Sequence, residues 1–146
     1  MTSALRFTVR GTPAPQGSKR HVGRGVMIES SANLKPWREA VKIAAIDAMN
    51  AAGWQMLDEP VVLVVDFYLK RPDSTAKRVV HQFKKPDLSK LVRSTEDALT
   101  DAGIYADDAR IIELIARKHF AIPPHYSGAS IWVGTLDAVE QQEVAS

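Results

Sequence analysis

Residues 84–108, KKPDLSKLVRSTEDALTDAGIYADD, contain the strongest helix signal in the chain. Small and apolar residues recur there at helical spacing and form one continuous face: Leu88, Leu91, Val92, Thr95, Ala98, Leu99 and Ala102. Asp87 occupies the position of an N-cap, and Gly103 follows the last turn, where a glycine commonly ends a helix. The sequence therefore predicts a helix from Leu88 to Ala102 with a polar outer face.

Strands and one further helix are predicted on both sides of this segment. In chain order they are a strand at 5–9, a helix at 36–52, an apolar strand at 60–70, the helix above, and strands at 109–122 and 129–135. Between the first two elements, a Gly-, Pro- and Lys/Arg-rich segment is expected to be a long loop or a short hairpin. The order β-α-β-α-β-β predicts an α/β fold, a four-stranded mixed sheet with two helices packed on it.

One domain is expected over residues 1–136, followed by a frayed polar tail at 137–146. In the strand at 109–122, the apolar side chains alternate with polar ones, so we expect Ile112, Leu114 and Ala116 to share one face.

Composition excludes several classes of protein. The chain has 146 residues, a net charge of +2 and no cysteine, which excludes disulfides and thiolate metal sites. No apolar run is long enough to span a membrane, and the N-terminus lacks the apolar segment of a secretory signal. These features predict a cytoplasmic protein.

Charge is distributed unevenly along the chain. Residues 1–42 and 68–94 each carry eight Lys and Arg against two acidic residues, whereas residues 95–146 carry three against nine. Basic and acidic segments separated in this way favour a positively charged surface that attracts a polyanion, beside an acidic pocket that could hold a cation. The alternative is a solvated surface with no binding role.

Acidic residues lie at both ends of the predicted helix. If Asp87, Asp107 and Asp108 converged, their oxygens would suit Mg²⁺ or Mn²⁺. A helix of this length is about 20 Å long, so Asp87 and Asp108 cannot meet along it. They could meet only if the chain folds back or a second subunit supplies the partner. Each residue also has a purely structural explanation. Asp87 could be only an N-cap, and Asp107 and Asp108 could be only turn residues before a strand. Arg93 could be only a surface partner of Asp97.

The segment KPDLSKLVRSTEDALTDAGIYADDARI resembles RusA-type Holliday junction resolvases, especially the phage-encoded members. Their pattern is D-L-D-N-L-x-K, then D-A-L, then D-D before an apolar strand; GTPAPQGSKR and KPWREAV are also similar to phage members. This resemblance implies a homodimeric, Mg²⁺-dependent endonuclease that cuts four-way DNA junctions. It maps the first essential aspartate to Asp87, the last to Asp108 and the lysine to Arg93; Asp97 and Asp107 also match.

Two positions depart from the family pattern, because Ser89 replaces the second aspartate and Arg93 replaces the lysine. The resemblance nevertheless predicts an active enzyme in which Asp87 and Asp108 hold Mg²⁺, Asp107 assists and Arg93 steadies the phosphate. A non-catalytic protein that binds branched DNA is the alternative, and Ser89 favours it. The residues expected to contact the DNA backbone are basic: Lys19, Arg20, Arg24, Lys77, Arg78, Lys84, Lys85 and Lys90.

Overall fold

The computed structural model describes residues 3–17, 19–21, 27–29 and 32–145, with the backbone alone at 19–21, 27–29 and 141–145. Its strands are β1 (Ala4–Arg10), β2 (Lys19–His21), β3 (Met27–Glu29), β4 (Val61–Leu69), β5 (Ile111–Phe120) and β6 (Gly128–Thr135). Its helices are α1 (Leu34–Ala52), α2 (Leu88–Ala102) and α3 (Leu136–Ala145), with a short 3₁₀ turn, η1 (Asp108–Arg110), before β5. No helix of the described residues is long and apolar enough to cross a membrane.

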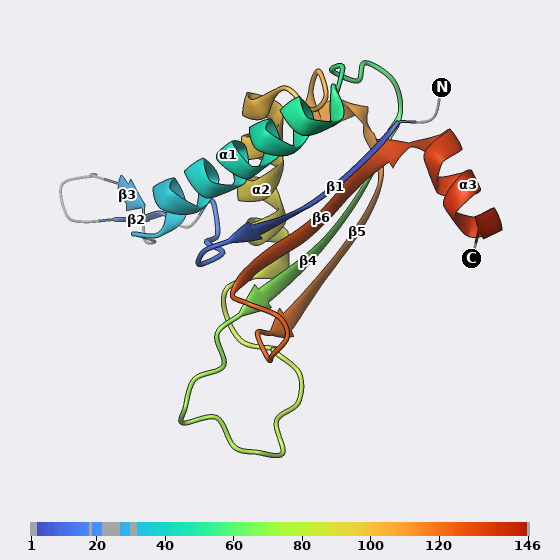
Figure 1. Ribbon diagram of the computed structural model, residues 1–146. Coiled ribbons are helices and arrows are strands. Elements are labelled where there is room, and N and C mark those ends of the chain that lie inside the picture. Colours follow the sequence, from blue (N-terminus) through green and yellow to red (C-terminus); the bar gives the residue numbers. More distant parts are fainter. Residues whose placement is uncertain (1–2, 18, 22–26, 30–31, 146) are drawn as a thin grey trace.

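Four strands form a mixed sheet in the order β1-β6-β4-β5 (Figure 1). The β1–β6 and β6–β4 pairs are antiparallel, and β4–β5 is parallel. The predicted α/β fold with β-α-β-α-β-β order is therefore confirmed. In the segment expected to be a loop or hairpin, β2 and β3 pair antiparallel as a separate small sheet.

The core lies between one face of the sheet and helices α1 and α2. Leu63, Val65 and Phe67 of β4 are fully buried there, each facing the helices at the strand period of two. Trp37 of α1 is also buried, and its indole N–H donates to the hydroxyl of Thr95 on α2 at 3.3 Å. Burial of each large apolar side chain stabilises the fold by about 1.5–3 kcal/mol, so this layer fixes α2 on the sheet.

Helix α2 has the predicted bounds. Asp87 precedes it with extended backbone, and Gly103 ends it in the left-handed region at φ 88°. The Gly103 N–H donates to the carbonyl oxygens of Leu99 and Thr100, which would otherwise lack partners at the helix end.

The C-terminal segment differs from its prediction. Residues expected to form a frayed tail form α3, which contacts β6 and β4. The Thr135 hydroxyl accepts a hydrogen bond from the Ala138 N–H at 3.4 Å, and Ala138 is buried. Thr135 therefore caps the start of α3, and Ala138 anchors its first turn in the core.

Only part of the apolar face predicted for β5 is buried. Ile112 and Leu114 are 58% and 43% exposed, although Leu114 and Ala116 face the helix layer. These side chains are exposed because β5 is an edge strand of the sheet and a cavity separates it from α2.

The other face of the sheet has a polar cluster around Asp66 of β4. Its carboxylate accepts hydrogen bonds from Arg117 at 3.0 Å and lies 2.7 Å from His119 Nε2. Burial would raise the pKa of Asp66, but the hydrogen bonds from His119 and Arg117 outweigh it and the pKa is lowered. Asp66 is therefore a structural partner on this face.

Candidate active site

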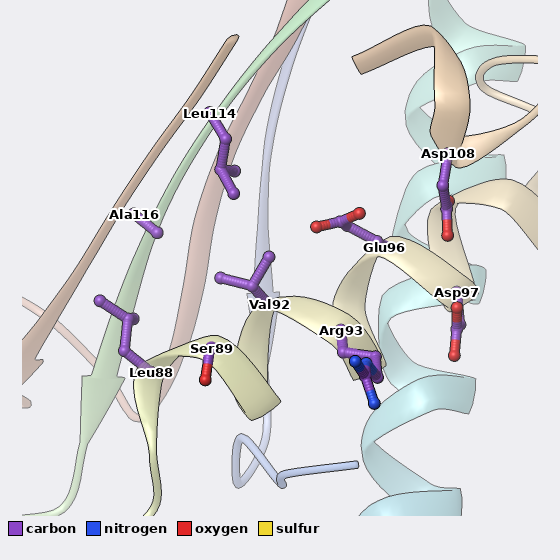
Figure 2. A pocket seen from close by; sticks show the side chains of 9 residues that line it. All are labelled: Leu88, Ser89, Val92, Arg93, Glu96, Asp97, Asp108, Leu114 and Ala116. Carbon is purple, nitrogen blue, oxygen red and sulfur yellow. The ribbon is translucent and has the colours of Figure 1, made fainter. Parts of the chain in front are cut away.

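A cavity of about 740 Å³ lies between α2 and β5 (Figure 2). Its apolar side is formed by Leu88 and Val92 of α2 facing Leu114 and Ala116 of β5. Its polar side chains are Ser89, Arg93, Glu96, Asp97 and Asp108. An open cavity with apolar walls and converging polar groups is the usual form of a ligand site.

Hydrogen bonds at both ends set α2 beside β5. Near the end of β5, the Lys118 ammonium donates to the carbonyl oxygens of Lys84 at 2.7 Å and Pro86 at 3.0 Å, just before α2 begins. At the other end, the hydroxyl of Thr100 donates to the carboxylate of Asp108, just before β5 begins. Helix and strand therefore run in opposite directions, and the cavity extends along both.

Asp108 is held in place by the end of α2. It is the first residue of η1 and lines the cavity. Besides the hydrogen bond from Thr100, it lies near the buried phenol of Tyr105; burial raises the pKa of that phenol, and the charge of Asp108 raises it further. The Asp108 carboxylate is thus the negative group at this end of the cavity.

Glu96 is the functional candidate that the sequence analysis missed. Its side chain points from α2 into the cavity, between Asp108 and Leu114 in Figure 2. Burial raises its pKa to about 7, the charges of Asp108 and Asp97 add to the effect, and Arg93 opposes it. Two carboxyl groups therefore face the same space. Helical spacing could have indicated this residue, because Glu96 follows Ser89 by seven positions and Arg93 by three.

Arg93 is an exposed cation on the cavity wall. The loop after β1 passes directly beside it: the N–H of Gln16 donates to the Lys90 carbonyl at 3.1 Å. Gly17 of this loop lies next to the Arg93 guanidinium, because a side chain begun at this glycine would place its Cβ atom 3.4 Å from Arg93 Nη1. A phosphate that enters the cavity would meet this guanidinium, which binds phosphate oxygens in a bidentate manner.

The structure places the other two predicted metal ligands outside this cavity. Asp87 lies at the N-cap position, yet its side chain makes no capping hydrogen bond and instead pairs with Lys90 at 3.6 Å. Asp107 caps η1, accepting from the Ala109 N–H at 3.3 Å. Asp108 and Arg93 thus share one cavity, and Asp87 and Asp107 do not line it.

The donor chemistry of the cavity fits a hard divalent cation. Its polar atoms include the carboxylate oxygens of Asp108, Glu96 and Asp97 and the hydroxyl of Ser89, with no imidazole or thiol. Mg²⁺ takes oxygen ligands and needs only one or two carboxylates when water and phosphate complete its shell. Within one chain, no group of three Asp, Glu or His side chains among the described residues is close enough to hold a metal.

The predicted DNA-contact residues lie in different parts of the chain. Lys77, Arg78, Lys84 and Lys85 are exposed in the connection between β4 and α2. Lys19 and Arg20 belong to β2, where the side chains are not described, and Arg24 lies outside the described residues. Lys90 is half-buried and pairs with Asp87.

Comparison with known protein families gives a match that covers most of the chain. A family model described as endodeoxyribonuclease RusA matches residues 10–127, which include the cavity and both elements that form it. A search of curated proteins finds no match.

Proposed function

Because the chain belongs to the RusA family of endodeoxyribonucleases, which are Holliday junction resolvases, we propose that it is a catalytically active, Mg²⁺-dependent member. The proposed reaction is hydrolysis of a phosphodiester bond in a four-way DNA junction. The observation that carries this proposal is the cavity between α2 and β5, where Asp108, Glu96 and Arg93 line the same space.

Each of these side chains has a role that follows from its chemistry. Asp108, oriented by Thr100, and Glu96 supply oxygens for Mg²⁺, with Mn²⁺ as a possible substitute. A bound ion would activate a water molecule and neutralise charge on the scissile phosphate. Arg93 binds the phosphate and stabilises the charge that develops on it. The apolar side chains of Leu88, Val92 and Leu114 form the opposite wall of the cavity.

Glu96 also favours activity over the alternative of a non-catalytic junction-binding protein. That alternative rests on Ser89, which removes one carboxylate from the family pattern. Glu96 lies two helical turns further on the same side of α2 and returns one carboxylate to the cavity. The cavity therefore has a carboxyl group on α2 although residue 89 is a serine.

The exposed basic residues before α2 would follow the DNA backbone. Lys77, Arg78, Lys84 and Lys85 lie in the chain that leads to the start of the cavity. Contacts of this kind bind phosphates without reading base sequence, and their strength falls with salt. We propose that the enzyme acts as a homodimer, with two sites for the two symmetric cuts, in the cytoplasm where junction DNA forms.

A cleavage and binding experiment on a synthetic four-way junction tests this proposal. The active-enzyme proposal expects nicking in Mg²⁺ by the wild type and a loss of about 100-fold in Arg93→Ala. Arg38→Ala is the matched control, because Arg38 pairs with Asp101 on the surface. Tight junction binding with no cutting in either Mg²⁺ or Mn²⁺ would establish the non-catalytic alternative.

A further inference from the structure

The face of the sheet that points away from α1 and α2 carries basic and aromatic side chains where β4 and β5 end. The strand registers place four residues in one row across the sheet: Arg10, Gly128, Tyr68 and His119. Arg10 is exposed, and Tyr68 and His119 are only partly buried. Helix α3 begins at the opposite end of β6 (Figure 1). The row is therefore accessible, on the face opposite the cavity between α2 and β5.

Two cavities adjoin at the connection between β5 and β6. One, of about 240 Å³, lies beside Arg10 and Tyr68, and the other, of about 550 Å³, lies beside Lys70. His125 and Tyr126 line both, so we treat the two cavities together as one aromatic groove. The larger volume falls in the range of about 300–1,000 Å³ that is usual for ligand sites.

Planar rings dominate the aromatic groove. Tyr68 stacks with His125, with 4.2 Å between ring centroids, and with His119, with 5.0 Å between ring centroids. Tyr126 is 66% exposed, and the Arg10 guanidinium lies 4.0 Å from the centroid of its ring. Arg10 covers one face of this ring, so the other face is open to a further planar group.

Positive charge flanks these rings. Arg10 lines one cavity and Lys70 the other, and neither belongs to an ion pair within the part of the chain that the structure describes. A guanidinium stacks through its flat face, so the N–H donors at its edge stay available to phosphate. Asp66, an acid on the same face, already pairs with Arg117 and His119. The groove therefore suits a polyanion that also carries planar rings, which is a nucleic acid.

The open face of Tyr126 distinguishes single-stranded from duplex DNA. In a duplex, the neighbouring bases cover both faces of each base, and an aromatic side chain cannot stack there. An unpaired base presents its face, and proteins that bind single strands combine aromatic side chains with a positively charged groove. The groove has both features.

The aromatic groove lies at the same end of the sheet as the start of α2. The parallel strands β4 and β5 both end there, and Lys118 of β5 donates to the carbonyl oxygen of Pro86, just before α2 (Figure 1). The exposed basic connection from β4 to α2 begins at Lys70, which lines the groove. A DNA strand can therefore pass from the cavity beside α2, along this connection, to the groove.

We propose that the aromatic groove binds single-stranded DNA, with one unpaired base stacked on Tyr126 and the adjoining phosphates bound by Arg10 and Lys70. The choice of DNA as the nucleic acid rests on the proposed nuclease function. The groove thus holds a strand that has lost its base pairing, while paired arms of the substrate contact the other face of the sheet.

Fluorescence anisotropy of a labelled oligothymidylate of about 12 nucleotides, in EDTA, tests the stacking contact. Tyr126→Ala should weaken binding about tenfold, as the loss of one stacked base predicts, whereas Tyr126→Phe should stay within about twofold of the wild type. Ile122→Ala, at another exposed position of the same connection, is the matched control and should bind normally. Wild-type affinity in Tyr126→Ala, or an equal loss in Tyr126→Phe, would overturn the stacking contact.

Other ligands decide which partner the groove takes. For a duplex of the same length, Tyr126→Ala should change the affinity by less than about twofold, because the bases are covered. Equal losses for duplex and single strand would overturn the preference for unpaired DNA. A polyglutamate peptide has no ring to stack and should not displace the oligothymidylate; displacement would show that the groove recognises charge alone. Tighter binding of oligouridylate than of oligothymidylate would overturn the choice of DNA.

Salt dependence tests the phosphate contact. Arg10→Gln removes one cation, so the slope of log affinity against log salt for the single strand should become smaller by about 0.7. Arg38→Gln, at a surface pair with Asp101, is the control and should keep the wild-type slope. An unchanged slope in Arg10→Gln would overturn the role of Arg10.

These binding measurements separate the groove from the proposed nuclease function, since none of them requires cleavage. A chain that never nicks a junction, but binds single strands through Tyr126, would overturn the nuclease function and leave the groove standing. A chain that nicks, but whose affinity for single strands is unchanged in Tyr126→Ala, would overturn the groove alone.

Discussion

The ammonium group of Lys118, on β5, donates a hydrogen bond to the carbonyl oxygen of Pro86, 3.0 Å away, immediately before α2. A second hydrogen bond from the same group reaches the carbonyl oxygen of Lys84 at 2.7 Å. The start of α2 is thereby tied to the end of the edge strand β5, and this contact fixes the direction of the cavity between them.

Removal of this tie should affect both stability and activity. Lys118→Met keeps the aliphatic length but loses both hydrogen bonds, so the free energy of unfolding should fall by about 1–2 kcal/mol. Junction nicking should fall about tenfold, because the start of α2 loses its position. Denaturant unfolding and a nicking assay measure the two effects, with Lys35→Met, at an exposed position of α1, as the control. A Lys118→Met protein with wild-type stability and rate would show that the tie is unimportant.

Thr100 is expected to act by positioning Asp108. Thr100→Val keeps the shape of the side chain but loses the hydroxyl that donates to the carboxylate. Nicking should fall about tenfold while junction affinity stays the same, since the loss of an orienting partner costs about 10–100-fold at comparable sites. Thr100→Ser should recover most of the rate. Failure of the serine variant to recover it would assign the valine effect to packing.

Glu96 should make the fold less stable as the pH rises. Its pKa is raised from the ordinary 4.5 to about 7 by burial and by the charges of Asp108 and Asp97. Between these two values the folded chain binds the proton more tightly than the unfolded chain, so the free energy of unfolding decreases as the pH increases.

The variant Glu96→Gln removes this dependence. Since Glu96 is only half-buried, we expect the variant to gain about 1–2 kcal/mol relative to the wild type between pH 4.5 and pH 7. Chemical unfolding across this range, without divalent ions, measures the difference. Parallel stability curves for the two proteins would mean that Glu96 ionises normally.

Ser89 offers a gain-of-function test. Ser89→Asp restores the carboxylate of the family pattern, and we expect it to lower the Mg²⁺ concentration for half-maximal nicking about tenfold, as an added ligand charge tightens oxygen sites. Ser89→Asn is the control of equal size without the charge. If both substitutions change the Mg²⁺ dependence equally, the carboxylate has no specific role at this position.

Much of the fold was predictable because local signals agreed with one another. The apolar stripe of α2, the position of Asp87 and the glycine at 103 all indicated the same helix, and the structure has it. The buried strand β4 was similarly evident from its apolar run. The helix α3 was not predicted, because its start depends on Thr135 and on burial of Ala138 against the sheet.

The site was harder to predict than the fold, because which side chains share a cavity depends on how the helices and strands pack against one another. Sequence spacing placed Arg93 on the outer face of α2, but it could not show that β5 runs beside that helix in the opposite direction. For this reason Glu96 was missed, although it shares the cavity with Asp108. Alternation in β5 gave the correct faces, but it could not distinguish an edge strand from a central one, so the exposure of Ile112 and Leu114 was unexpected.

The most direct test of the central claim, that the cavity between α2 and β5 is the active site of a nuclease, is single-turnover nicking of a four-way junction in Mg²⁺ by Asp108→Asn. The substitution keeps the size of the side chain and removes its charge, so nicking should fall at least about 100-fold while junction binding remains within about threefold of the wild type. The control Asp101→Asn, at a surface pair near the end of α2, should nick normally. Wild-type nicking by Asp108→Asn would contradict the account.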